Sequence, residues 1–158
     1  MRRPEREITD LNKIEQILND AKVCRLALFD EEYPYIVPMC FGYDLDGDKL
    51  ELYFHSAPKG KKIELIKANN RAAFEIDSLE QIIRGDIPCS FSAEYSSVTG
   101  VGTLDVINGI DKLTGLNLMM RKYDQTGKEF KYSEQMLNSV VVLKLTVEEF
   151  CCKSNQST

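Results

Sequence analysis

Polar and basic side chains gather where an apolar strand of this sequence gives way to a helix. The stretch from Tyr53 to Ile66, YFHSAPKGKKIELI, holds the only histidine of the chain, His55, followed by Ser56 and by Gly60 among three lysines. A helix start presents unpaired backbone N–H groups and the positive end of the helix dipole, so it favours anions. Glycine allows close approach to the backbone, and lysine adds positive charge. The pattern indicates a phosphate site, although an ordinary helix start with exposed lysines has the same residues.

Familiar phosphate and metal motifs do not account for these residues. The stretch is not a Walker A loop, because it lacks the first glycine of that motif and the Ser or Thr that follows its lysine. Residues 44–48, DLDGD, hold three aspartates, but Gly47 comes too early for an EF-hand calcium loop. One histidine and no Cys-x-x-C pair make a structural zinc site unexpected. We therefore predict no metal site, and His55 is either a functional group at the strand end or a structural histidine.

Length, charge and cysteine content narrow the class of protein. A chain of 158 residues with 43% hydrophobic residues can form one folded domain with a real core. The net charge of −5 argues against nucleic acid or an anionic membrane as the main partner. The charged N-terminus has no apolar signal core and no run suits a bilayer, so we expect a soluble cytoplasmic protein. Five cysteines, an odd number, predict reduced and mostly buried thiols.

The hydrophobic pattern predicts a mainly β chain with a few helices. A first helix is expected over residues 11–21, capped by Thr9 or Asp10. Pro38 removes a ladder donor from its strand, which suggests an edge or a bulge. The other helices are expected at 59–69, 112–123 and 133–137, and the strands at 23–29, 35–41, 50–55, 71–77, 89–107 and 140–147.

Turn signals connect these elements into one architecture. Asp46-Gly47 predicts a hairpin turn within 44–48, and residues 78–88 are expected to be irregular because glycine and proline interrupt them. Residues 89–107 form either one long bent strand or a strand pair. Short strands joined by hairpins, with helices as plugs, indicate an antiparallel barrel in a single α+β domain over 1–158.

Three segments, in this order and spacing, resemble a known family. They are CRLALFDEEYPYIVPMCFGYD, LYFHSAPKGKKIELIKANNRAAFEID and SSVTGVGTLDVI. The chain resembles the FMN-binding split-barrel proteins related to pyridoxamine 5′-phosphate oxidase, nearest the branch of nitroimidazole-resistance (Nim-type) proteins. The resemblance implies a six-stranded antiparallel Greek-key split barrel with flanking helices. It also implies a homodimer with FMN in a groove between the subunits.

The resemblance further implies which residues contact the cofactor, and it makes the anion the phosphate of FMN. The strand along the flavin supplies Val37, Pro38, Met39 and Cys40, and the strand end beside the ring and phosphate supplies His55 and Ser56. The basic pair at the phosphate is Lys61 and Lys62. The next strand toward the cofactor supplies Tyr95, Ser96 and Ser97.

Some positions depart from the family pattern. Cys40 stands where many relatives carry a polar residue, Pro58 interrupts the usual run before the glycine, and Cys151-Cys152 replaces a small pair near the C-terminus. The C-terminal Arg and His residues that pyridoxamine phosphate oxidation needs are missing, which disfavours that reaction.

The resemblance implies an FMN-dependent oxidoreductase that reduces a small nitroaromatic, such as a nitroimidazole, or a quinone-like molecule, with His55 as the candidate catalytic residue. The flavin would carry the electrons, while the protein orients the reactants and neutralises charge. A non-catalytic flavin-binding module for storage or sensing is the alternative. A haem-binding split barrel is a third hypothesis.

Overall fold

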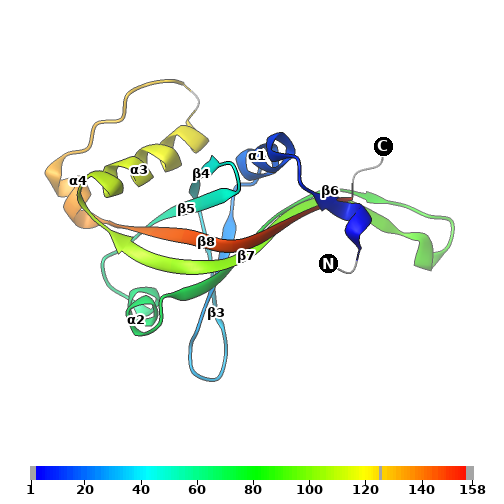
Figure 1. Cartoon of the computed structure of the whole chain (residues 1–158), viewed down its shortest axis with the longest axis horizontal. Coiled ribbons are helices and arrows are strands. Elements are labelled where there is room, and N and C mark those ends of the chain that lie inside the picture. The colour runs from blue at the N-terminus through cyan, green and yellow to red at the C-terminus, as the bar shows by residue number, and fades with distance from the viewer. Residues whose placement is uncertain (1–2, 125, 156–158) are drawn as a thin grey trace.

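The computed structural model describes residues 3–124 and 126–155, whose strands form one twisted antiparallel sheet (Figure 1). The strand order is β3-β2-β6-β7-β8-β5-β4, and β1 pairs with β8 outside this path. The strands are β1 (Glu7–Ile8), β2 (Cys24–Leu28), β3 (Tyr35–Met39), β4 (Gly42–Asp46), β5 (Lys49–Ser56), β6 (Arg71–Ile83), β7 (Ser92–Ile107) and β8 (Val141–Asn155). The helices are α1 (Leu11–Asp20), α2 (Lys61–Ala68), α3 (Gly109–Tyr123) and α4 (Glu134–Ser139), with short 3₁₀ helices at Pro4–Arg6 and Pro88–Ser90. The expected antiparallel α+β class is confirmed.

The sheet has eight strands rather than the six that we expected. The sequence pattern does not reveal β4, because three aspartates within 44–48 are unusual in a strand. In the structure the aspartates of β4 are exposed, while Tyr43 and Leu45 are half-buried. Strand β1 has two residues, too few for a periodic pattern. The predicted hairpin is confirmed, since Gly47 has φ +61° and β4 pairs with β5 on either side of it, but the turn is confined to residues 47–48 because 44–46 belong to β4.

The expectation of an irregular segment at 78–88 is wrong for most of its length. Strand β6 continues to Ile83, which pairs with Ser92 of β7. Residues 79–95 thus form an arm that is two-stranded beyond the pairing of Tyr95 with Asn155 and projects from the rest of the sheet, at the right of Figure 1. Hydrogen bonding to β7 over many residues decides this conformation, and the local breakers affect only the tip of the arm.

Successive side chains of a strand point to opposite faces of the sheet, and the apolar side chains on one face fill the core. Helix α1 begins at Asp10, whose side chain accepts from the Asn12 backbone N–H at 2.9 Å, so one of the two expected caps is confirmed. Its buried residues, Ile14 and Leu18, join the main core. Helix α2 contributes its own buried isoleucines to the same core.

Helix α3 covers a second, smaller core beside β4 and β5. Glycine makes this close packing possible, because a Cβ on Gly42 would lie 2.5 Å from the Met119 backbone nitrogen. A Cβ on Gly115 would lie 2.7 Å from the ring of Tyr53. Within residues 3–124 and 126–155, no helix combines the length and apolar character needed to cross a bilayer.

The five cysteines are free thiols with different exposures. Cys24 and Cys152 are buried, and Cys151 is half-buried. Cys40 and Cys89 are exposed, because one follows the end of β3 and the other lies at the tip of the arm. The expectation of mostly buried thiols is therefore wrong for these two residues.

Candidate functional site

The start of α2 opens onto a cavity of about 440 Å³. Gly60 is the N-cap residue and has φ +126°, a conformation that L side chains rarely adopt. A Cβ at this position would meet no atom within 4 Å, so conformation rather than space requires the glycine. The cavity wall brings together four residues expected at the phosphate: His55, Ser56, Lys61 and Lys62.

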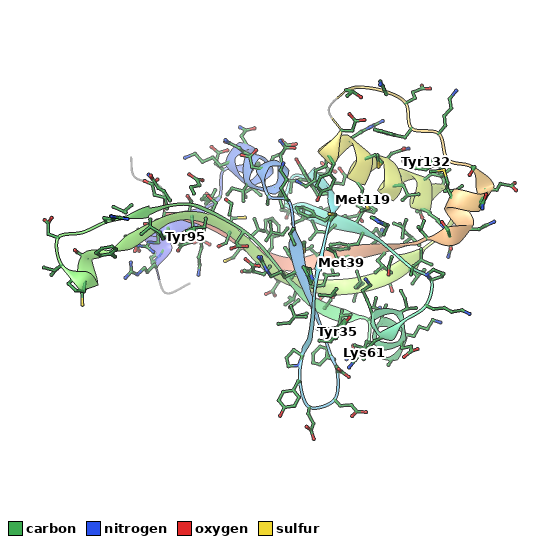
Figure 2. The ribbon with its side chains drawn as sticks, turned by 180° about the vertical axis from the view of Figure 1, so that it is seen from behind. Tyr35, Met39, Lys61, Tyr95, Met119 and Tyr132 are labelled. Carbon is green, nitrogen blue, oxygen red and sulfur yellow. The ribbon has the colours of Figure 1, made fainter. Side chains whose placement is uncertain are left out.

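Lys61, which lines this cavity, is already paired with a carboxylate from a neighbouring turn. Its Nζ lies 2.5 Å from Oδ2 of Asp30, in the turn between β2 and β3. It also lies 5.5 Å from the centre of the Tyr35 ring, and Figure 2 shows these two side chains beside each other. The hydrogen bond to Asp30 raises the pKa of Lys61. The positive charge of Lys61 is therefore largely balanced within the protein.

Lys62 has a different environment. Its Nζ donates to Sδ of Met39 at 3.4 Å, and among the described residues we find no ion pair for it. Partial burial lowers the pKa of Lys62. A thioether is a weak acceptor that carries no charge. Lys62 thus presents a partly desolvated charge that a bound anion would balance.

The residues expected along the flavin divide between two faces of β3. Val37 is half-buried and Met39 buried, and both point toward the core side. Pro38 and Cys40 are exposed and lie on the alternate positions. Met39 is the member of this group that contacts the lysine pair. The predicted strand therefore lies next to α2, with its four side chains pointing in alternate directions.

The last expected group, on β7, lies away from the α2 cavity within one chain. Tyr95 accepts from Nη1 of Arg6 at 3.4 Å, and Figure 2 shows it on the arm, far from Lys61. Ser96 is buried and donates to Oγ of Ser154 at 3.3 Å. Ser97 is half-buried and pairs with Lys153 across the sheet. One chain does not bring Tyr95, Ser96 and Ser97 together with the start of α2.

Sequence reasoning missed Tyr35, which lines the cavity, and Asp30, which pairs with the cavity residue Lys61. Asp30 belongs to the acidic turn DEEYP, which we interpreted only as a chain reversal. An acidic side chain in a turn next to an anion site is a signal that could have drawn attention to it. The pairing with Lys61 crosses 31 positions of the chain, so only the tertiary fold identifies the partner.

A partly open antiparallel sheet with a basic, glycine-capped helix at its side defines a split-barrel protein. A family model described as pyridoxamine 5′-phosphate oxidase matches residues 10–154. The chain belongs to this pyridoxamine 5′-phosphate oxidase family. Among curated protein sequences, no significant match was found.

Solved structures agree with this family. A protein from Bacteroides thetaiotaomicron with a proposed role in 5-nitroimidazole antibiotic resistance is 31% identical, with a TM-score of 0.79 over 95% of this chain and 90% of that one. An FAD- and haem-binding protein from Mycobacterium smegmatis is 20% identical, with a TM-score of 0.82 over 96% of this chain and 74% of that one. A flavocytochrome from Azotobacter vinelandii is 16% identical, with a TM-score of 0.80 over 99% and 72%. The first match confirms the resemblance to the nitroimidazole-resistance branch, and the other two show the shared fold.

Proposed function

We propose that this protein is an FMN-dependent oxidoreductase whose α2 cavity holds the phosphate of the cofactor. The observation that carries this proposal is the state of Lys62, a partly buried ammonium group at a glycine-capped helix start that has no carboxylate partner within residues 3–124 and 126–155. Backbone N–H groups at the first turn of α2 and the hydroxyl of Ser56 would complete the phosphate contacts. Membership of the family supports FMN as the source of this phosphate.

FMN supplies the electron-transfer chemistry when it is bound, and the protein supplies position and charge. The open space beside Gly60 and the charge of Lys62 fit an anionic group. His55 is exposed at the end of β5 and lines the same cavity. We assign it the role of holding a proton for the substrate, where an imidazole can stabilise negative charge on an oxygen atom.

The substrate class in this proposal is a small nitroaromatic or quinone-like molecule. Its support is the 31% identity to the Bacteroides protein with a proposed role in 5-nitroimidazole resistance. We place the protein in the cytoplasm and expect it to act without nucleic acid or a membrane.

A homodimer is part of the same proposal. The residues expected at the cofactor lie at two separated places of one chain, the α2 cavity and the base of the arm. A second copy that brings its arm to the α2 cavity would unite Tyr95 and Ser97 with Lys62. This arrangement would place two equivalent sites between the subunits.

Binding of FMN and riboflavin to the apo-protein tests the phosphate site. A charge-assisted hydrogen bond contributes about 1.5–3 kcal/mol, so Lys62→Met should weaken FMN binding about tenfold to hundredfold and leave riboflavin binding nearly unchanged. Lys67→Met is the matched control, because Lys67 is exposed on the last turn of the same helix. Equal losses for the two flavins would contradict the proposal.

Turnover separates the enzyme from its alternatives. We expect the FMN-loaded protein to be reduced anaerobically by NADH or NADPH and to be re-oxidised by a nitroimidazole or a quinone. Tight FMN binding without re-oxidation by either would indicate a flavin-binding module. A haem absorption band in the purified protein, together with weak FMN binding, would indicate the haem-binding alternative.

A further inference from the structure

The two neighbouring lysines of α2 are not equivalent in the free protein. Lys61 is held by Asp30 and by the ring of Tyr35, whereas Lys62 donates to an uncharged sulfur. The Asp30 side chain is 25% exposed and that of Lys61 is 56% exposed, so the carboxylate lies deeper than the ammonium group it binds. The turn between β2 and β3 thereby reaches across to the first residue of α2.

This turn brings negative charge to the place where a phosphate would bind. Asp30, Glu31 and Glu32 are consecutive, and both Asp30 and Glu31 act on Lys61 electrostatically. A phosphate monoester carries a charge of roughly −1.5 to −2 at neutral pH. The phosphate and the Asp30 carboxylate would therefore compete for the same ammonium group.

We propose that Asp30 is an internal counter-ion that occupies Lys61 in the free protein and gives it up when a phosphate group enters the α2 cavity. Exposed ion pairs contribute little to stability, so a dianion beside a helix start can displace this carboxylate. The positive charge of Lys62 attracts the phosphate whether or not Lys61 is paired. Asp30 lowers the affinity for the phosphate because it holds Lys61 in an ion pair. The cofactor is then more easily exchanged than two unengaged lysines would allow. This inference rests on the proposed function, because it takes the phosphate of FMN as the competing anion.

The inference is tested by FMN and riboflavin titrations of three apo-proteins: the wild type, Asp30→Asn and Glu32→Gln. Asp30→Asn keeps the shape of the side chain and removes its charge, so FMN should bind about threefold to tenfold more tightly, mainly through slower dissociation. Riboflavin affinity should remain within about twofold of the wild type, because riboflavin has no phosphate. Glu32→Gln is the matched control, since it removes one charge from the same turn without breaking the ion pair.

A double-mutant cycle shows whether Lys61 mediates the effect. When Lys61 is replaced by Met, adding Asp30→Asn should improve FMN binding no more than adding Glu32→Gln to the same Lys61→Met protein. Equal gains with and without Lys61, equal gains from Asp30→Asn and Glu32→Gln, or weaker FMN binding by Asp30→Asn would each overturn the inference. These outcomes are distinct from failure of the proposed function, in which the wild-type protein would not prefer FMN over riboflavin.

Discussion

The ammonium group of Lys62 donates to the sulfur of Met39 at 3.4 Å and thereby joins the first turn of α2 to strand β3. These two segments are the ones that the family resemblance assigns to the phosphate and to the flavin. The sulfur orients the lysine without neutralising it, because a thioether carries no charge. This contact is the structural reason for our proposal that Lys62 is the main phosphate ligand.

Gly60→Ala should impair the phosphate site through backbone strain. Gly60 has φ +126°, and an L residue there costs roughly 1–3 kcal/mol or shifts the helix start. We expect lower stability in urea unfolding together with weaker binding of FMN. Gly47→Ala is the control, because Gly47 has φ +61° in a turn that does not line the cavity. The control should lose stability but keep FMN affinity, and loss of affinity in both variants would argue against a local effect.

His55→Ala should retain FMN and slow substrate reduction. A positioned general acid contributes roughly 10²–10⁴-fold to a rate, so a loss in this range is expected if His55 supplies a proton. The rate is measured as anaerobic re-oxidation of the reduced, FMN-loaded protein by a nitroimidazole or quinone. Added imidazole should restore part of the rate. An unchanged rate in the variant would make His55 a structural residue.

Tyr53 should make stability depend on pH through Glu51. Burial acts to raise the pKa of Glu51, but hydrogen bonds from the Tyr53 hydroxyl at 2.5 Å and Lys144 at 3.1 Å lower it below the ordinary 4.5. As the pH falls, the Glu51 carboxylate is therefore protonated at a higher pH in the unfolded chain than in the folded protein. The stability that this carboxylate contributes is present above pH 4.5 and is lost as the pH falls below it. Tyr53→Phe should cost about 0.5–1 kcal/mol at pH 7 and less at pH 3–4.

Tyr132→Phe is the control for this pH dependence. Its hydroxyl donates to the Asn117 side-chain oxygen at 3.1 Å, and an amide does not titrate. Its cost in urea unfolding should be the same at pH 7 and at pH 4. A constant cost for Tyr53→Phe as well would show that Glu51 does not carry the effect.

Lys122→Met should be among the more destabilising substitutions in the protein. The buried ammonium donates to the backbone oxygens of Leu18, Asn19 and Ala21 at 2.7, 2.8 and 2.6 Å, at the C-terminal end of α1. Methionine would leave these carbonyls without their donor, at a cost of about 2–4 kcal/mol in urea unfolding. Arg121→Met, at an exposed neighbouring position, should cost less than about 0.5 kcal/mol. A similar cost for both would contradict the capping role.

The outer face of the sheet should mediate the proposed dimer. Ile36, Ala27, Ala73 and Val101 form one row across β3, β2, β6 and β7, and Ile36 is 63% exposed. Ile36→Lys would place a charge in an apolar interface, so light scattering should show a monomer at micromolar concentration. Ile110→Lys changes an isoleucine that is 74% exposed on α3 and should leave the dimer intact. A monomeric wild-type protein with bound flavin would refute the dimer.

The sequence determines the class of this fold because its signals are local. Alternating apolar residues, the Asp46-Gly47 turn and the capped helix at 11–20 depend on near neighbours, and the structure confirms them. The start of α2 is also a local feature of the sequence, because a glycine with a positive φ stands immediately before two lysines.

Only the tertiary structure decides which distant groups share an environment. It pairs Lys61 with Asp30, sets Lys62 against Met39, and turns 77–83 into strand by pairing it with β7. It also places Tyr95 and Ser96 away from α2, although the family pattern assigns both places to one cofactor site. These relationships follow from sheet register and from packing across the barrel, and the residues concerned lie too far apart in sequence for local periodicity to reveal them.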